Sequence, residues 1–259
     1  MSDIHEDIYQ GLENQPAPEK PLIFSLGHRC TSSSLIKELK LKFESYPFDW
    51  VVSKLDVVAN CIETDFSEFL NQANYETMES ETFNLCDREK KQITSEKVVY
   101  NKFYEDQAVL PNDLGTYGMQ LCMSHHDIRT EDHLGYFERC VRRFRSMLSS
   151  DKQKYYLYIH PLTGQRDHSA TTLDLQKYFL FFTEYFKTKT VNSFGIYFML
   201  VQNDEKKGQV ELVFQNEDCV IYTLYANSTL IDGGGVFCGD SWYDEQYKLL
   251  TTIEKHINS

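Results

Sequence analysis

The chain lacks the hydrophobic segments that would place a protein in a membrane or direct it out of the cell. It has no uninterrupted apolar run of about 18 residues, the length that spans a bilayer. Its first 20 residues are polar and contain no hydrophobic core of a signal peptide. We therefore expect a soluble, cytoplasmic protein without a membrane span.

Basic residues are few compared with acidic ones. Lys and Arg number 26, whereas Asp and Glu number 39, which gives a net charge of −13 at pH 7. A protein this acidic repels phosphate backbones, so a general nucleic-acid-binding role is excluded. One basic cluster stands in a helical segment, and we interpret it as a solvated or ion-paired helix face; it comprises Arg139, Arg142, Arg143 and Arg145.

Patterns that bind metals or nucleotides are also missing. The cysteines form no CxxC pair and are odd in number, which fits neither a zinc ribbon nor a disulfide framework. The glycines match neither GxGxxG nor GxxxxGK[ST]. We predict free thiols, no metal and no cofactor. The seven cysteines are Cys30, Cys61, Cys86, Cys122, Cys140, Cys219 and Cys238.

The hydrophobic pattern predicts an α/β domain. In its second half, helical periods alternate with short apolar runs, the arrangement of a layered domain with a mixed, partly parallel sheet flanked by helices. Residues 1–20 are predicted to be a flexible N-terminal arm, and 21–259 a single domain. Helices are expected at 31–40, 54–71, 132–149, 172–187 and 243–257. Strands are expected at 21–26, 97–100, 117–123, 155–159, 196–201, 210–214 and 219–225.

Cys30 stands where a strand, a sharp turn and a helix follow one another. The apolar residues 22–24 lead into Gly27, and cap-type residues at 31–33 open a helix directly after Cys30. A thiol at a helix N-terminus feels the positive end of the helix dipole, which favours the thiolate. Cys30 is therefore a candidate nucleophile, and the alternative is a small buried thiol that packs in the turn.

A thiol nucleophile needs a base and a group that orients the base. His125, His126 and Asp127 follow a short predicted strand, a usual position for a catalytic histidine. Residues two apart share a face of an extended segment, so Asp127 does not obviously orient His126. The alternative interpretation is that these three residues cap the following helix.

Further polar residues follow predicted strands. Ligands of open α/β sheets bind at the carboxyl ends of the strands, so these residues are candidates for substrate binding. They are Gly27, His28, His160, Asp240 and Trp242, the last two after a glycine triplet at 233–235. A separate block follows at Pro47-Phe48-Asp49-Trp50. Its aromatic rings are expected in the core, with Asp49 accepting backbone hydrogen bonds behind the Cys30 turn.

The order of these motifs resembles a bacterial and viral family described as papain-like cysteine peptidases. The similarity runs from about residue 22 to 160. The motifs that carry it are Ser25-Leu26-Gly27-x-x-Cys30, Tyr46-Pro47-Phe48-Asp49-Trp50, Asp65-Phe66, Phe69-Leu70, His126-Asp127 and Arg139-x-x-Arg142-Arg143-Phe144.

The resemblance implies that Cys30 is the nucleophile and His126 the base of a hydrolase or acyl transferase, acting on a peptide or on a small-molecule or glycan substrate. Two features depart from the family: His160 stands where an arginine is usual, and no orienting residue is identifiable on a later strand. The family is also similar to parts of surface-polysaccharide proteins. A nucleotide-sugar-dependent glycosyltransferase and a non-catalytic binding module therefore remain alternatives, and in the first of these Asp127, His160 and Asp240 would be polar contacts.

Overall fold

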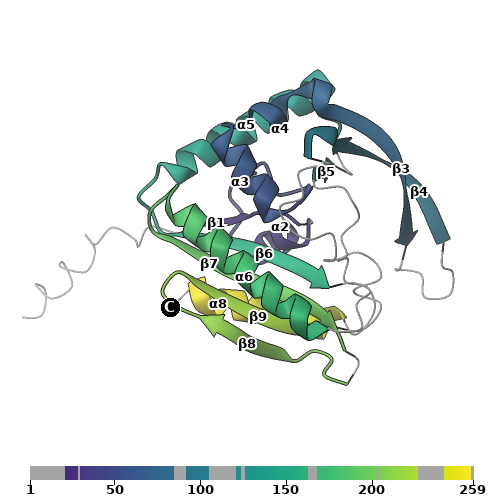
Figure 1. The fold of residues 1–259 in the computed structure, drawn as a ribbon. Helices are drawn as coiled ribbons and strands as arrows, with labels where there is room; N and C mark the ends of the chain where they lie inside the picture. The colour runs from purple at the N-terminus through teal and green to yellow at the C-terminus, as the bar shows by residue number, and fades with distance from the viewer. Residues whose placement is uncertain are drawn as a thin grey trace, which may run out of the picture.

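The computed structural model describes residues 21–28, 30–84, 92–104, 121–123, 126–162, 168–203, 205–226 and 242–257. These residues form an α/β structure with mixed sheets and flanking helices, as the sequence predicts (Figure 1). The predicted N-terminal arm lies outside the described residues. Within the described part of the chain, no helix is both long enough and apolar enough to cross a bilayer.

A five-stranded sheet forms the centre of the molecule. Its strands lie in the order β1-β6-β7-β9-β8, and all neighbours are parallel except β8, which runs antiparallel to β9. The residues of β6, β7 and β9 are mostly apolar or aromatic, because helices cover both faces of the sheet. The bounds are β1 Leu22–Ser25, β6 Lys154–Leu162, β7 Ser193–Gln202, β8 Val210–Gln215 and β9 Cys219–Ala226.

Helices cover the two faces of this sheet in separate layers. One buried cluster joins the sheet to α2 (Thr31–Glu38) and α8 (Trp242–Ile257). The second cluster joins the opposite face to α3 (Leu55–Glu63), α5 (Glu131–Leu148) and α6 (His168–Lys187). Alternate residues of a strand point to opposite faces, so a residue's position along its strand determines which helices it meets.

A smaller antiparallel sheet lies beside this layer. Its strand order is β2-β5-β4-β3, with β2 at Val52–Ser53, β5 at Leu121–Met123, β4 at Gln92–Asn101 and β3 at Tyr75–Asn84. The β3–β4 pair is a long hairpin that extends away from the helices (Figure 1). The short helices α4 (Ser67–Leu70), η1 (Gln72–Asn74) and η2 (Lys102–Tyr104) complete this part of the chain.

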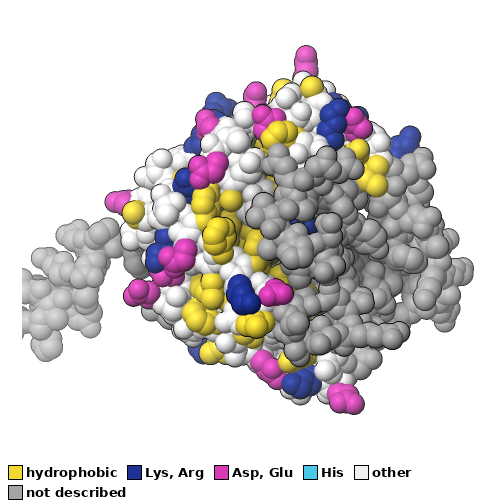
Figure 2. Space-filling model, in the orientation of Figure 1, with side chains coloured by type: hydrophobic (Ala, Val, Ile, Leu, Met, Phe, Trp, Pro, Cys, Tyr) yellow, Lys and Arg dark blue, Asp and Glu magenta, His cyan; other side chains and the backbone are white. Residues whose placement is uncertain are grey.

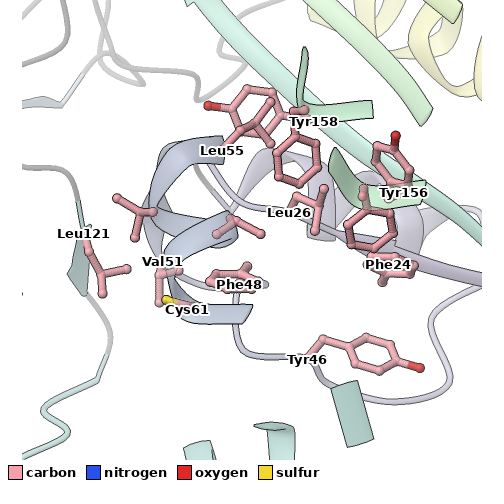
Figure 3. Packing of buried hydrophobic residues seen from close by; sticks show 14 of the residues in the cluster. Phe24, Leu26, Tyr46, Phe48, Val51, Leu55, Cys61, Leu121, Tyr156 and Tyr158 are labelled. Atoms are coloured by element: carbon pink, nitrogen blue, oxygen red, sulfur yellow. The ribbon is translucent and has the colours of Figure 1, made fainter. Parts of the chain in front are cut away.

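The larger core is rich in aromatic rings. Figure 3 shows Phe24 and Tyr156 of the central sheet and Phe48 and Tyr46 of the loop before β2 within one cluster. Phe48 is fully buried, and its ring lies 5.7 Å from that of Phe144 on α5, edge to face. The loop after α2 is thereby tied to α5. On the face seen in Figure 2, acidic and basic side chains are interspersed with hydrophobic ones. Phe181 of α6 is among the exposed large hydrophobic residues.

Three sequence-based expectations need correction. The helix expected at 54–71 ends at Glu63, because Asp65 and Phe66 adopt left-handed backbone angles (φ 48° and 61°) that a helix cannot contain. The strand expected at 97–100 begins earlier, at Gln92, and runs to Asn101 as β4. Trp50 is half-buried rather than part of the core, with the Lys42 ammonium 5.9 Å from its ring centre.

In addition, the strand expected at 155–159 is longer than expected, because Pro161 does not end it. Residue 157 of β6 accepts a hydrogen bond from Leu26, so odd-numbered residues of β6 turn their backbone groups toward β1. Since the pairing with β1 stops at Leu157, the missing N–H of Pro161 faces a side without a ladder partner. The strand therefore continues to Leu162 while pairing with β7.

Candidate functional site at the carboxyl edge of the sheet

The turn after β1 is held in an unusual backbone conformation. Gly27 and His28 both have positive φ, 89° and 59°. The His28 N–H donates to the Ser53 carbonyl at 2.9 Å, and the Ser53 hydroxyl donates to the Leu26 carbonyl at 3.0 Å. The short strand β2 therefore fixes the turn from the side. Strained conformations of this kind cluster at functional sites.

Cys30 follows this turn as the N-cap residue of α2. It is partly exposed, whereas Cys61, Cys122, Cys140 and Cys219 are buried. Burial raises the pKa of the Cys61 thiol to about 12 and that of the Cys219 thiol to about 11. Among the described cysteines, Cys30 alone combines partial exposure with a helix N-terminus. The predicted position of Cys30 between strand and helix is confirmed, and Cys86 and Cys238 lie outside the described residues.

His28 and His160 meet at the same edge of the sheet. Their rings are stacked, with centroids 4.5 Å apart and planes inclined by 13°. Both side chains are buried. The pairing of Ser25 with Leu157 explains the meeting, because three further residues along each parallel strand lead to His28 and His160. The sequence placed both residues after strands; the structure brings them into contact.

A tyrosine lies beneath this histidine pair. The Tyr158 ring is 5.9 Å from that of His28 and 6.2 Å from that of His160. Burial raises the pKa of Tyr158, and the nearby Asp56 carboxylate raises it further. In Figure 3 the Tyr158 hydroxyl points away from Phe48, to the margin of the cluster near Leu55. The phenol therefore stays neutral beside the histidines.

The N-terminus of α3 forms the neighbouring wall. The Tyr178 hydroxyl of α6 donates to the Asp56 carboxylate at 2.8 Å and accepts the Asp56 N–H at 2.9 Å. The N-cap residue Lys54 has a lowered pKa because it is partly buried. The sequence offered no signal for this wall, since Asp56, Tyr158 and Tyr178 are brought together only by the packing of α3 and α6 on the sheet.

His126 precedes α5, and its ring packs in a second aromatic cluster formed by residues of that helix. Its ring stacks on that of Tyr136 with centroids 5.0 Å apart, and the ring of His133 is also 5.0 Å away, edge to face. Burial raises the pKa of Tyr136 to about 12. The base role of His126 stays a prediction, because these ring contacts with α5 do not test a contact with Cys30.

Asp127 takes part in a surface ion pair. Arg129 donates to both of its carboxylate oxygens at 2.8 Å, which lowers the pKa of Asp127. The Asp127 N–H donates to Nδ1 of His133 at 2.8 Å, so the backbone here is anchored to the first turns of α5. The described hydrogen-bond partners of Asp127 are thus Arg129, Thr130 and His133, and its role in orienting His126 remains a prediction.

The Phe48–Trp50 block supports the site from behind, as expected for Phe48 and Asp49. Asp49 is fully buried and accepts the Tyr46 N–H at 2.7 Å and the ammonium of Lys42. Asp49 therefore fixes the loop that follows α2 from within, by joining Lys42 to Tyr46.

The remaining predicted site residues cannot be placed at this edge. Asp240 and the glycine triplet lie outside the described residues. Trp242 is the first residue of α8, and its side chain is outside the described part. Among the residues that are described, no group of three or more His, Cys, Asp or Glu side chains is arranged to hold a metal ion.

Comparisons with known proteins identify the family of this chain. No curated protein and no solved structure matches the chain. A family model matches residues 21–204, which include β1, the Cys30 turn, the Phe48–Trp50 block and β6. The chain belongs to the family described as "Putative papain-like cysteine peptidase (DUF1796)".

Proposed function

We propose that the protein is a cysteine-nucleophile hydrolase or acyl transferase of the cytoplasm, with a peptide as its substrate and Cys30 as its nucleophile. The observation that carries this proposal is the position of Cys30: a partly exposed thiol at the N-terminus of α2, directly after a strained turn. The family to which the chain belongs supports the same chemistry. Nothing in the comparisons or among the described residues favours the sugar-transfer alternative.

The chemistry follows from this position. A histidine takes the proton of Cys30, and the thiolate attacks the substrate carbonyl carbon. The negative charge moves to the carbonyl oxygen, where the N–H groups of the first turn of α2 can stabilise it. The leaving amine departs with the proton from the histidine, and water or an acceptor then attacks the thioester to release Cys30. Gly27, His28 and His160 border the place where the substrate would lie.

The resemblance assigns the base to His126 and its support to Asp127, whereas the proposal of Cys30 as the nucleophile holds whichever histidine takes its proton. The stacking of His126 on Tyr136 would fix the plane of the imidazole, which is what a base needs. Asp127 would act through the backbone contact that it makes with His133, since its carboxylate is engaged by Arg129.

The proposal is tested by competitive labelling of the thiols. The wild-type protein is treated with a limiting amount of iodoacetamide at pH 7, and the modified cysteines are identified by peptide mass spectrometry. Thiolate fraction and access set the rate, so Cys30 should react at least about tenfold faster than Cys61 or Cys140. Cys30→Ser should remove the fast phase and Cys140→Ser should leave it unchanged. Labelling of Cys30 no faster than that of Cys140 would refute the nucleophile.

A further inference from the structure

We infer that the stacked pair His28–His160 is the group that receives the Cys30 proton and holds it as one shared charge. This inference rests on the proposed function, because it requires Cys30 to be the nucleophile. It departs from the assignment of the base to His126 and gives His160, expected only to contact substrate, a catalytic role.

The first argument is position. His28 is separated from Cys30 by a single residue in the turn that leads into α2, and His160 is stacked on His28. Three elements therefore meet at one edge of the sheet: the end of β1, the end of β6 and the start of α2. The described ring contacts of His126 are with the α5 residues His133, Tyr136 and Phe137.

The second argument is the conformation of His28. A histidine with φ 59° is uncommon, and such strain persists only where surrounding contacts impose it. The contacts that impose it are the His28 N–H bond to the Ser53 carbonyl and the close approach of Ser53 to Gly27. The left-handed turn carries the His28 ring toward the helix layer that covers Tyr158, where it meets His160.

The third argument is charge. A buried imidazolium needs compensation, and here the thiolate of Cys30 would supply the opposite charge. The face of the second imidazole and the nearby Tyr158 ring, with its centroid 5.9 Å from that of His28, supply π-systems that attract a cation. One proton suits this stack, whereas two adjacent imidazolium rings would repel each other. Among the described residues, the Tyr158 ring of β6 lies beside the pair and the Ser53 carbonyl of β2 accepts the His28 N–H. Behind Tyr158, the Asp56 carboxylate of α3 accepts the Tyr178 hydroxyl of α6, and Lys54 precedes α3 as its N-cap residue.

The proton step is balanced within this group. The S–H bond of Cys30 breaks and an N–H bond forms on one ring of the pair, which gives a thiolate and an imidazolium. After attack on the carbonyl, the same proton passes to the leaving nitrogen as its bond to carbon breaks. Water then attacks the thioester, one of its protons goes to the stack, and the thiol is restored when that proton returns to sulfur.

The test compares two histidines with the same substitution. The rate of Cys30 alkylation by iodoacetamide is measured from pH 5 to pH 10 in the wild type, His160→Phe and His126→Phe. Phenylalanine keeps a ring in each stack, and thermal melts of all three proteins check folding. His28→Asn, which tolerates a left-handed backbone, serves as a second variant at the proposed pair.

We expect His160→Phe and His28→Asn each to lower the rate at pH 6.5 by about tenfold or more, a larger loss than that of His126→Phe, and to move the profile toward that of an ordinary thiol. Loss in His126→Phe with an unchanged His160→Phe would overturn the inference and leave the proposed function standing. Unchanged profiles in every variant would also overturn it, because the helix alone would then make the thiolate. A wild-type Cys30 that reacts like an ordinary thiol would refute the proposed function itself.

Discussion

Gly27→Ala should destabilise the protein through the turn that carries Cys30. The φ of 89° costs a residue with a side chain about 1–2 kcal/mol. The added Cβ would overlap the Ser53 hydroxyl and lie 3.2 Å from Ser53 Cβ and 3.5 Å from the Phe48 carbonyl oxygen. The hydroxyl must then leave the buried Leu26 carbonyl, which it bonds at 3.0 Å, at a cost of about 1–3 kcal/mol. The expected loss of unfolding free energy is therefore about 2–5 kcal/mol.

A double-mutant cycle in urea separates the two causes. Ser53→Ala removes the same hydrogen bond, so alone it should cost about 1–3 kcal/mol. In the Ser53→Ala background the overlap with the hydroxyl is gone, and Gly27→Ala should cost only the backbone strain of about 1–2 kcal/mol. The two substitutions should therefore couple by at least about 1 kcal/mol. Additive effects within about 0.5 kcal/mol, or a cost of Gly27→Ala below about 1 kcal/mol, would refute this account of the turn.

Two further predictions concern the supports of the site. Phe48→Ala should lower the unfolding free energy by about 3–5 kcal/mol because the ring is fully buried, whereas Trp50→Ala should lower it by about 1–2 kcal/mol because its ring is half-buried. Chemical denaturation of both variants measures the two losses, and equal losses would contradict this prediction. Lys154→Met should lower the unfolding free energy by about 2–4 kcal/mol, because the buried ammonium donates to three backbone carbonyls that a thioether cannot satisfy. A melting temperature equal to that of the wild type would contradict this prediction, since water would then replace the ammonium.

The hydrophobic pattern predicts a helix or strand correctly where a single repeat of apolar residues runs through the whole element. The stripe of apolar residues in 132–149 corresponds to α5, and the pair of apolar runs at 210–214 and 219–225 corresponds to the antiparallel β8–β9 pair. The helix predicted at 54–71 failed because Phe66 and Phe69 keep helical spacing across a break. Phe66 is held in a left-handed conformation by its packing between Phe48 and Phe144, which is tertiary and invisible in a local pattern.

The site was partly predictable for the same reason. Cys30 and its turn depend on residues that adjoin in sequence, so their arrangement could be derived. The contact of His28 with His160 depends on the register of β1 against β6, which no local pattern states. The sequence does not identify Tyr158, Asp56 and Tyr178 as site residues, because each fits the pattern of its own strand or helix. Asp49 was foreseen as a backbone acceptor, but its ion pair with Lys42 was not.

The most direct test of the central claim is whether Cys30 forms an acyl-enzyme. The wild type and Cys30→Ser are mixed with p-nitrophenyl acetate at pH 7, the release of p-nitrophenolate is followed by absorbance, and the acetylated residues are identified by mass spectrometry. We expect a burst of about one equivalent with the acetyl group on Cys30, followed by slower turnover, and no burst from Cys30→Ser. A burst that survives in Cys30→Ser, or acetylation confined to other residues, would contradict the assignment of Cys30 as the nucleophile.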